Sequence, residues 1–143
     1  MTLQNKYIQD IRENKSTLII VNGQKLIVDE NNFGVISLVK EYYNLKNSCS
    51  KLYIYDKLVG KGASLLIRDF DVKFVFAKTI TNTAYKLLKD VCEVKYDRIV
   101  PHILNRTHSD LCPIEKIANN YNKGEELYLE LKKFYEERGF IND

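Results

Sequence analysis

Two short stretches of the chain carry the residue types that could bind a ligand or take part in a reaction. Residues 56–64 end an apolar run and enter a predicted helix through two glycines that flank a lysine. Residues 105–115 form a polar segment that delivers a cysteine and a glutamate to the start of another predicted helix. Helix N-termini present unpaired amides and a partial positive charge, so both stretches are natural places for anions and thiolates. We expect the two stretches to meet in space.

The first stretch has two interpretations. Gly60 and Gly62 would let a ligand approach the backbone, and Lys61 adds a positive charge where the helix amides point. The same glycines would also serve a tight strand–helix turn and close packing of the helix on the sheet. No Walker-type phosphate loop matches here. Ligands of open α/β sheets usually lie at the carboxyl ends of the strands, which favours the anion-binding interpretation.

In the second stretch, Asn105 and Arg106 follow the last predicted strand. An arginine in such a loop can hold a phosphate or carboxylate through two hydrogen bonds. It could equally pair with Asp110 or Glu115 and order the loop.

Cys112 and Glu115 are the candidates for catalysis. A cysteine at a helix start faces the amides that stabilise a thiolate, whereas a buried, inert cysteine is the commoner case. Glu115 could act as a general acid or base, or could fold back onto the start of its own helix in a capping box. His108 is a second possible proton partner, although most loop histidines are only solvated.

A metal site could be assembled from His102, His108, Cys112 and Glu115. Only one thiolate is available, however, and the spacing between His108 and Cys112 straddles the predicted helix start. We therefore expect no metal and no cofactor.

The composition is that of one soluble globular domain. The chain has 143 residues, of which 45% are hydrophobic and 29% charged. Its net charge of +3 comes from 22 basic and 19 acidic residues that are interspersed, so we expect neither nucleic-acid nor membrane binding. The N-terminus lacks the apolar region of a signal peptide, so we expect a cytoplasmic protein with reduced Cys49, Cys92 and Cys112.

Hydrophobic spacing predicts an α/β domain. Strands separated by helices favour parallel pairing, whereas the Asn22-Gly23 pair predicts a hairpin. We predict a three-layer mixed sheet with this N-terminal hairpin, as a single domain over 1–143 with a core at about 17–119. The predicted elements are helices at 3–14, 35–45, from near 60, from 81, after Ser109 or Asp110 with Pro113 in its first position, and at 124–138, with strands at 17–21, 25–28, 52–55, 72–77 and, at the edge, 94–100.

The same two stretches resemble a known family. Asp56-Lys57-Leu58-Val59-Gly60-Lys61-Gly62-Ala63 looks like the family word D-x-x-V-G-K-A-A, and residues 105–115 look like N-R-x…C-P-x-E. Both words are typical of the domain-of-unknown-function family 1893, and the resemblance covers about residues 17–119. That family has no assigned activity and is similar in fold to the cytidine deaminases. The resemblance thus implies a cytidine deaminase-like fold.

Deaminases hold zinc at the starts of two neighbouring helices, with a His or Cys and a Glu on one and two Cys on the other. By element count these positions are residues 31–34 and 59–63, which contain no His, Cys or Glu. The resemblance therefore implies a relative without the zinc site, and we do not expect a zinc-dependent deaminase. Oligomers are common among proteins of this fold, so a homo-oligomer is also possible.

Three functions are consistent with the sequence. The leading hypothesis is a cytoplasmic protein that binds a small anionic ligand, either a nucleotide or a phosphorylated metabolite, without zinc. The first alternative is an enzyme that uses Cys112 as its nucleophile, and the second is an oligomeric assembly module. The expected ligand-binding residues are Gly60, Lys61, Gly62, Asn105, Arg106 and Cys112.

Overall fold

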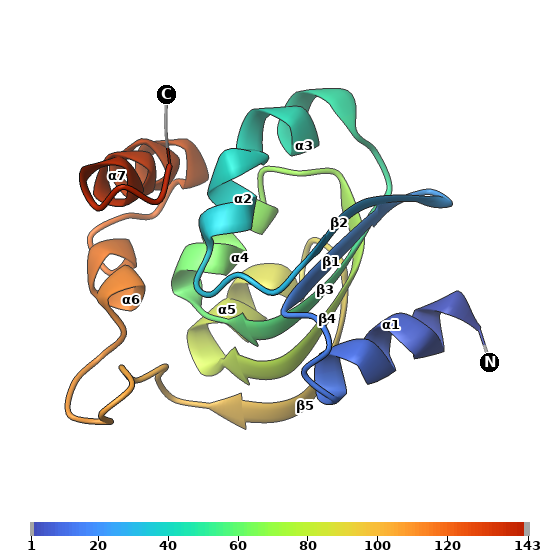
Figure 1. Cartoon of the computed structure of the whole chain (residues 1–143), viewed down its shortest axis with the longest axis horizontal. Coiled ribbons are helices and arrows are strands. Elements are labelled where there is room, and N and C mark those ends of the chain that lie inside the picture. Colours follow the sequence, from blue (N-terminus) through green and yellow to red (C-terminus); the bar gives the residue numbers. More distant parts are fainter. Residues whose placement is uncertain (1, 142–143) are drawn as a thin grey trace.

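The computed structural model describes residues 2–141, which form one five-stranded sheet with helices on both faces (Figure 1). The strand order is β2-β1-β3-β4-β5. None of the seven helices within the described residues is long and apolar enough to cross a membrane. The elements are α1 (Leu3–Arg12), β1 (Leu18–Asn22), β2 (Lys25–Glu30), α2 (Ile36–Lys40), α3 (Tyr42–Ser48), β3 (Leu52–Val59), α4 (Lys61–Ile67), β4 (Val72–Thr81), α5 (Asn82–Leu88), β5 (Glu93–Val100), α6 (Pro113–Ala118) and α7 (Gly124–Glu137).

The sheet is mixed, as predicted. Strand β1 pairs antiparallel with both β2 and β3, while β3, β4 and β5 run parallel. The parallel pairs follow from the helices α4 and α5, because a parallel connection must cross over a face of the sheet. The carboxyl ends of β3 and β4 therefore lie side by side where α4 and α5 begin.

The helices are divided unequally between the two faces. Helix α1 packs over β3 and β4 on one face, whereas α2, α4 and α5 lie on the other, with α6 and α7 outside α4 (Figure 1). The small cluster beneath α1 is formed by Ile11, Ile19, Val21, Tyr55, Phe74 and Phe76. The main core lies on the opposite face and extends from β1 to the inner side of α7.

Several predicted elements differ from the structure in their bounds. Strand β4 runs to Thr81, four residues beyond its expected end at residue 77. The helix expected over residues 35–45 is two helices, α2 and α3, that meet at Glu41 (φ −98°, ψ 4°). Strand β3 runs four residues beyond the expected end and includes Asp56. The first stretch is therefore divided equally, with residues 56–59 in the strand and residues 61–64 in the helix.

The start of α6 was predicted only in part: Pro113 is its first residue, as expected, but the capping residue differs. Neither Ser109 nor Asp110 caps it, because the N-cap is Cys112 and Pro113 occupies the first turn. The backbone N–H of Cys112 donates to the carbonyl of Ile103 (2.9 Å), in a segment where Leu104 and Leu111 form an isolated antiparallel bridge. These contacts hold residues up to Cys112 in an extended conformation, so the helix begins only after them.

The β1–β2 hairpin is confirmed, with a shift of one residue in its turn. Asn22 pairs with Lys25 as part of the ladder, so the two loop residues are Gly23 and Gln24. Gly23 has a φ of +64°, and a Cβ there would meet no atom within 4 Å. Glycine at the first position of a two-residue loop suits a type II′ turn, whose twist matches that of the strands.

We predict that Gly23→Ala lowers the free energy of unfolding by about 1 kcal/mol, because an L-residue with positive φ is strained even in open space. Urea denaturation measures the change. Gly23→Asn is the matched control and should lose less, since asparagine tolerates the left-handed region. An alanine variant as stable as the wild type would contradict the turn geometry.

Candidate functional site

The start of α4 holds a carboxylate supplied by the chain itself. The backbone N–H of Lys61 donates to Oε1 of Glu115 (2.9 Å), and that of Gly62 donates to Oε2 (3.1 Å). Both carboxylate oxygens are therefore bound by successive amides at a helix N-terminus, where negative charge is stabilised. The two stretches singled out in the sequence meet through these bonds.

Gly60 makes this approach possible. Its φ of −104° is open to any residue, so the need for glycine is steric. A Cβ on Gly60 would lie 2.5 Å from Cδ and 2.7 Å from Oε2 of Glu115. A Cβ on Gly62 would lie 3.1 Å from Cγ2 of Ile114, which is tight but tolerable. Gly60 thus admits the carboxylate, and Gly62 allows α6 to pack closely on α4.

The predicted role of Glu115 therefore has to be corrected. A capping box would place this carboxylate on the start of its own helix, α6, yet the N-cap of α6 has no side-chain hydrogen bond. Glu115 instead accepts hydrogen bonds from α4. One donor, Lys61, precedes Glu115 by 54 residues in the sequence. The local rule failed because a more distant helix start offered two unpaired amides.

The start of α2 is covered in a similar way by a side chain from α7. The backbone N–H of Val35 donates to the hydroxyl of Tyr135 (3.2 Å), and a Cβ on Gly34 would lie 2.8 Å from the same oxygen. Gly34 also has a φ of +67°. The pKa of Tyr135 is raised to about 12, mainly by burial and in smaller part by the nearby Cys112, while the hydrogen bond from Val35 acts in the opposite direction. The sequence offered no signal for this contact.

Cys112 is the N-cap of α6, three residues before Glu115. It is half-buried, packs against the main core and is close enough to Tyr135 to influence its hydroxyl. Cys49, which the sequence placed in a polar loop, is also half-buried, and burial raises the pKa of its thiol.

The remaining predicted ligand-binding residues lie in the loop before α6. Oδ1 of Asn105 accepts from the backbone N–H of Ser109 (3.1 Å), so its amide orders the loop. The guanidinium of Arg106 lies 5.7 Å from the ring centroid of Phe33, next to the start of α2. The alternative that Arg106 pairs with Asp110 or Glu115 is not supported, because Asp110 pairs with Lys116 and Glu115 bonds to the α4 amides.

The donor atoms here do not suit a metal ion. Across residues 2–141, no group of three or more His, Cys, Asp or Glu side chains is placed to hold one. His108 stands in the loop before α6 with a φ of +56° and is exposed. At the start of α4, backbone N–H groups are the available donors, and a cation cannot bind to them. Both oxygens of the nearby Glu115 carboxylate already accept from these N–H groups.

Asp56 is a residue that the sequence interpretation missed. It lies in β3, at the head of the first stretch, and its side chain is only 8% exposed. Burial raises its pKa from 3.8 to about 7, although the backbone N–H groups of Lys57 and Leu58 act in the opposite direction. The available signal was an acidic residue directly after an apolar strand run. Buried carboxyls with raised pKa values are concentrated at functional sites.

Asp56 and Glu30 lie on either side of Leu18, because Leu18 is the pairing partner of both in β1. Partners in an antiparallel ladder share a face, so both carboxyls face the main core side. Glu30 accepts hydrogen bonds from Ser37, near the start of α2, and from Asn32. The start of α2 is thus tied to the sheet through Glu30.

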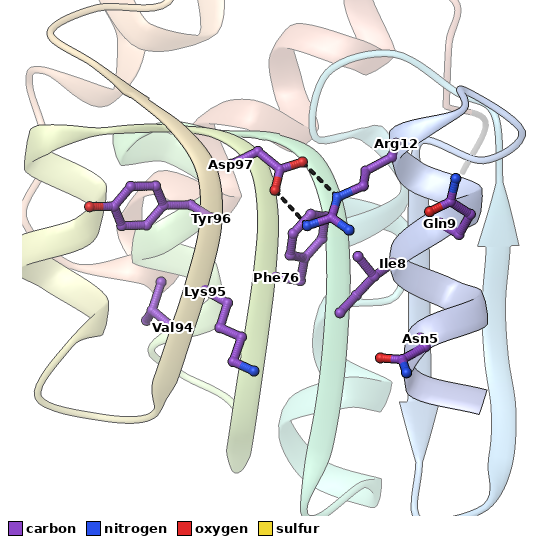
Figure 2. A pocket seen from close by; sticks show the side chains of 9 residues that line it. All are labelled: Asn5, Ile8, Gln9, Arg12, Phe76, Val94, Lys95, Tyr96 and Asp97. Atoms are coloured by element: carbon purple, nitrogen blue, oxygen red, sulfur yellow. Dashed lines mark hydrogen bonds and ion pairs between the residues drawn. The ribbon is translucent and has the colours of Figure 1, made fainter. Parts of the chain in front are cut away.

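A hollow of about 550 Å³ lies on the other face of the sheet, between α1 and β5 (Figure 2). Arg12 donates two hydrogen bonds to Asp97 there, at 2.8 and 2.7 Å, and lies over Phe76. No sequence feature had pointed to this hollow, and it is separated by the sheet from the helix starts of α2 and α4.

The family model described as domain of unknown function DUF1893 matches residues 6–135. The chain belongs to this family. A crystal structure of a DUF1893 family protein from Thermotoga maritima is similar to this DUF1893 chain, with a TM-score of 0.75 and 23% identity over 92% of this chain and 88% of that one. At this identity the likeness shows the fold alone. No curated protein matches the chain.

We predict that Glu115→Ala lowers the free energy of unfolding of this DUF1893 protein by roughly 1–3 kcal/mol, because two amides lose a charged acceptor. Urea denaturation tests this. Glu137→Ala, at an exposed glutamate near the end of α7, is the control and should have little effect. Equal losses in the two variants would mean that the Glu115 contact contributes nothing to stability.

We also predict a pH dependence that belongs to Asp56. Because burial raises its pKa to about 7 in the folded chain, the folded state holds a proton that the unfolded state releases near pH 4. The contribution of Asp56 to stability is therefore complete below about pH 4 and is lost as the pH rises to about 7.

Asp56→Asn removes this titration. Between pH 5 and pH 8 the wild type loses the contribution of Asp56, whereas the variant does not. The free energy of unfolding of the variant minus that of the wild type should therefore be larger at pH 8 than at pH 5 by roughly 1–3 kcal/mol, measured by urea denaturation. Asp90→Asn, at an exposed position, should follow the wild type at both values. Parallel curves for wild type and Asp56→Asn would show that Asp56 titrates normally.

Proposed function

We propose that this DUF1893 protein binds a small anionic ligand, a nucleotide or a phosphorylated metabolite, without a metal. The observation that carries the proposal is the pair of α4 amides that hold Glu115 at 2.9 and 3.1 Å. These amides already donate to the two oxygens of one anion, and a phosphate or another carboxylate could accept the same two hydrogen bonds. The ligand therefore competes with Glu115 for the same two donors.

The surrounding residues support exchange of one anion for another. Gly60 has no side chain of its own to block the amides, so the space that Glu115 fills is open to another anion once Glu115 leaves, and Lys61 adds a half-exposed positive charge. Arg106 belongs to an exposed loop and can move from Phe33 toward a ligand. When a ligand displaces Glu115, α6 loses its bond to α4, so ligand binding is coupled to the position of α6.

We further propose that the fold is of the cytidine deaminase-like type. Support comes from the strand order β2-β1-β3-β4-β5 with an antiparallel hairpin at one edge, and from the contact between α2 and α4 on one face of the sheet. The residues at the two helix starts do not fit the zinc of deaminases. They present backbone amides, which are bonded to Tyr135 and Glu115.

The geometry favours binding over catalysis by Cys112. Glu115, the nearest expected proton partner, has both carboxylate oxygens engaged by α4. His108, the other, is exposed in its loop. Cys112 is better placed to contact a ligand from the side of α2.

Titration calorimetry with AMP tests the proposal. Glu115→Gln keeps the side-chain size but removes the competing charge, so it should bind AMP more tightly than the wild type. Adding Lys61→Ala to that variant should weaken AMP binding by roughly 1–3 kcal/mol, the range for a hydrogen bond to a charged group. Adenosine, which lacks the phosphate, should not bind.

Lys89→Ala in the same background is the control, because Lys89 is exposed at the end of α5. It should leave AMP binding unchanged. Absence of binding by Glu115→Gln to AMP and to inorganic phosphate at millimolar concentration would overturn the proposal.

A further inference from the structure

Strand β5 ends the sheet with an open and regular edge. It is last in the strand order, and no strand among residues 2–141 covers its outer side. Most of its side chains are exposed, including Tyr96 (40%) and Ile99 (37%). Its register with β4 is uniform from Glu93 to Val100, so its outer N–H and C=O groups form a continuous row. Such an edge is a template for pairing with another strand.

The other edge of the sheet is less suitable. In the β1–β2 ladder, Ile20 pairs with Val28 and Val21 with Leu26, which leaves Ile27 as the extra residue of a bulge. A bulge bends a strand and interrupts the row of outward groups at its middle. Pairing with a further strand is therefore favoured at β5 rather than at β2.

Successive side chains of β5 point to opposite faces of the sheet, which decides which of them would meet those of a paired strand. Lys95 and Asp97 point to the α1 face, while Tyr96 points to the opposite face (Figure 2). The Tyr96 ring lies 5.6 Å from that of Tyr85 in α5, in an edge-on contact. Asp97 is bonded to Arg12 but remains 33% exposed.

Charge restricts how β5 could pair with a second copy of itself. A two-fold antiparallel pair must be centred on one residue that faces its own equivalent. Centres at Lys95, Asp97 or Arg98 place identical charges opposite each other, which is unfavourable. Centres nearer the ends leave most of the strand unpaired. A centre at Tyr96 places Lys95 of each copy opposite Asp97 of the other.

We propose that β5 pairs antiparallel with β5 of a second copy, centred on Tyr96, so that the two sheets become one continuous sheet. On one face, the two Tyr96 rings meet beside the Tyr85 rings and bury apolar area. On the other face, two Lys95–Asp97 pairs form, and each Asp97 carboxylate can still accept from Arg12, because a carboxylate offers several acceptor sites.

The dimer should be concentration-dependent. A single strand pair and four tyrosines bury less than the roughly 1,200–2,000 Å² of stable interfaces. Sedimentation velocity over a range of concentrations should therefore show a monomer that converts to a dimer. A wild-type chain that stays monomeric at millimolar concentration overturns the proposal.

A charge exchange tests the register itself. Lys95→Asp places a second carboxylate opposite Asp97, and Asp97→Lys places two lysines opposite each other, so each variant alone should be monomeric. A mixture of the two restores opposite charges at both positions and should dimerise. The loss of the exposed Arg12–Asp97 pair in the second variant should cost the fold little.

Lys40→Asp, at an exposed position in α2, is the control and should dimerise like the wild type. Circular dichroism verifies that each variant is folded. A wild-type dimer that persists in Lys95→Asp, or a mixture that stays monomeric while the wild type dimerises, overturns the proposed pairing.

Discussion

The arrangement of the C-terminal half depends on one requirement, the satisfaction of backbone amides at the starts of α2 and α4. Both helices begin where water is largely excluded, and unpaired buried N–H groups cost free energy. The hydroxyl of Tyr135 and the carboxylate of Glu115 meet this need. Because these side chains come from α7 and α6, the two helices must lie outside α2 and α4. Gly34 and Gly60 are required for the same reason, since a side chain at either position would displace the capping atom.

Much of the fold could be predicted from the sequence, because local rules govern it. Alternating apolar residues, the Asn22-Gly23 pair and the lengths of the helices indicated the mixed sheet and its hairpin. The position of the candidate site could also be predicted, because glycines and polar residues mark the ends of parallel strands.

The partners within the site could not be predicted. Glu115 obeys the pattern of a local capping box but bonds to another helix, and Arg106 lies over Phe33 rather than beside an acid. Both outcomes depend on which groups the folded chain brings within reach, and spacing along the sequence does not contain that information. Asp56 was missed for a related reason, since its burial follows from the position of β3 between β1 and β4. A carboxyl group buried in a central strand breaks a local rule, as residues of functional sites often do.

The contact between Tyr135 and Val35 spans 100 residues of sequence, and that between Glu115 and Lys61 spans 54. Contacts that close such long loops form late, because the entropy of loop closure must be overcome before they contribute. During synthesis on the ribosome, α2 and α4 therefore emerge long before the side chains that cap them. The sheet can assemble in the meantime with both helix starts open to solvent and to any anion in it. Closure by α6 and α7 is then the step that separates a partly folded chain from the native protein.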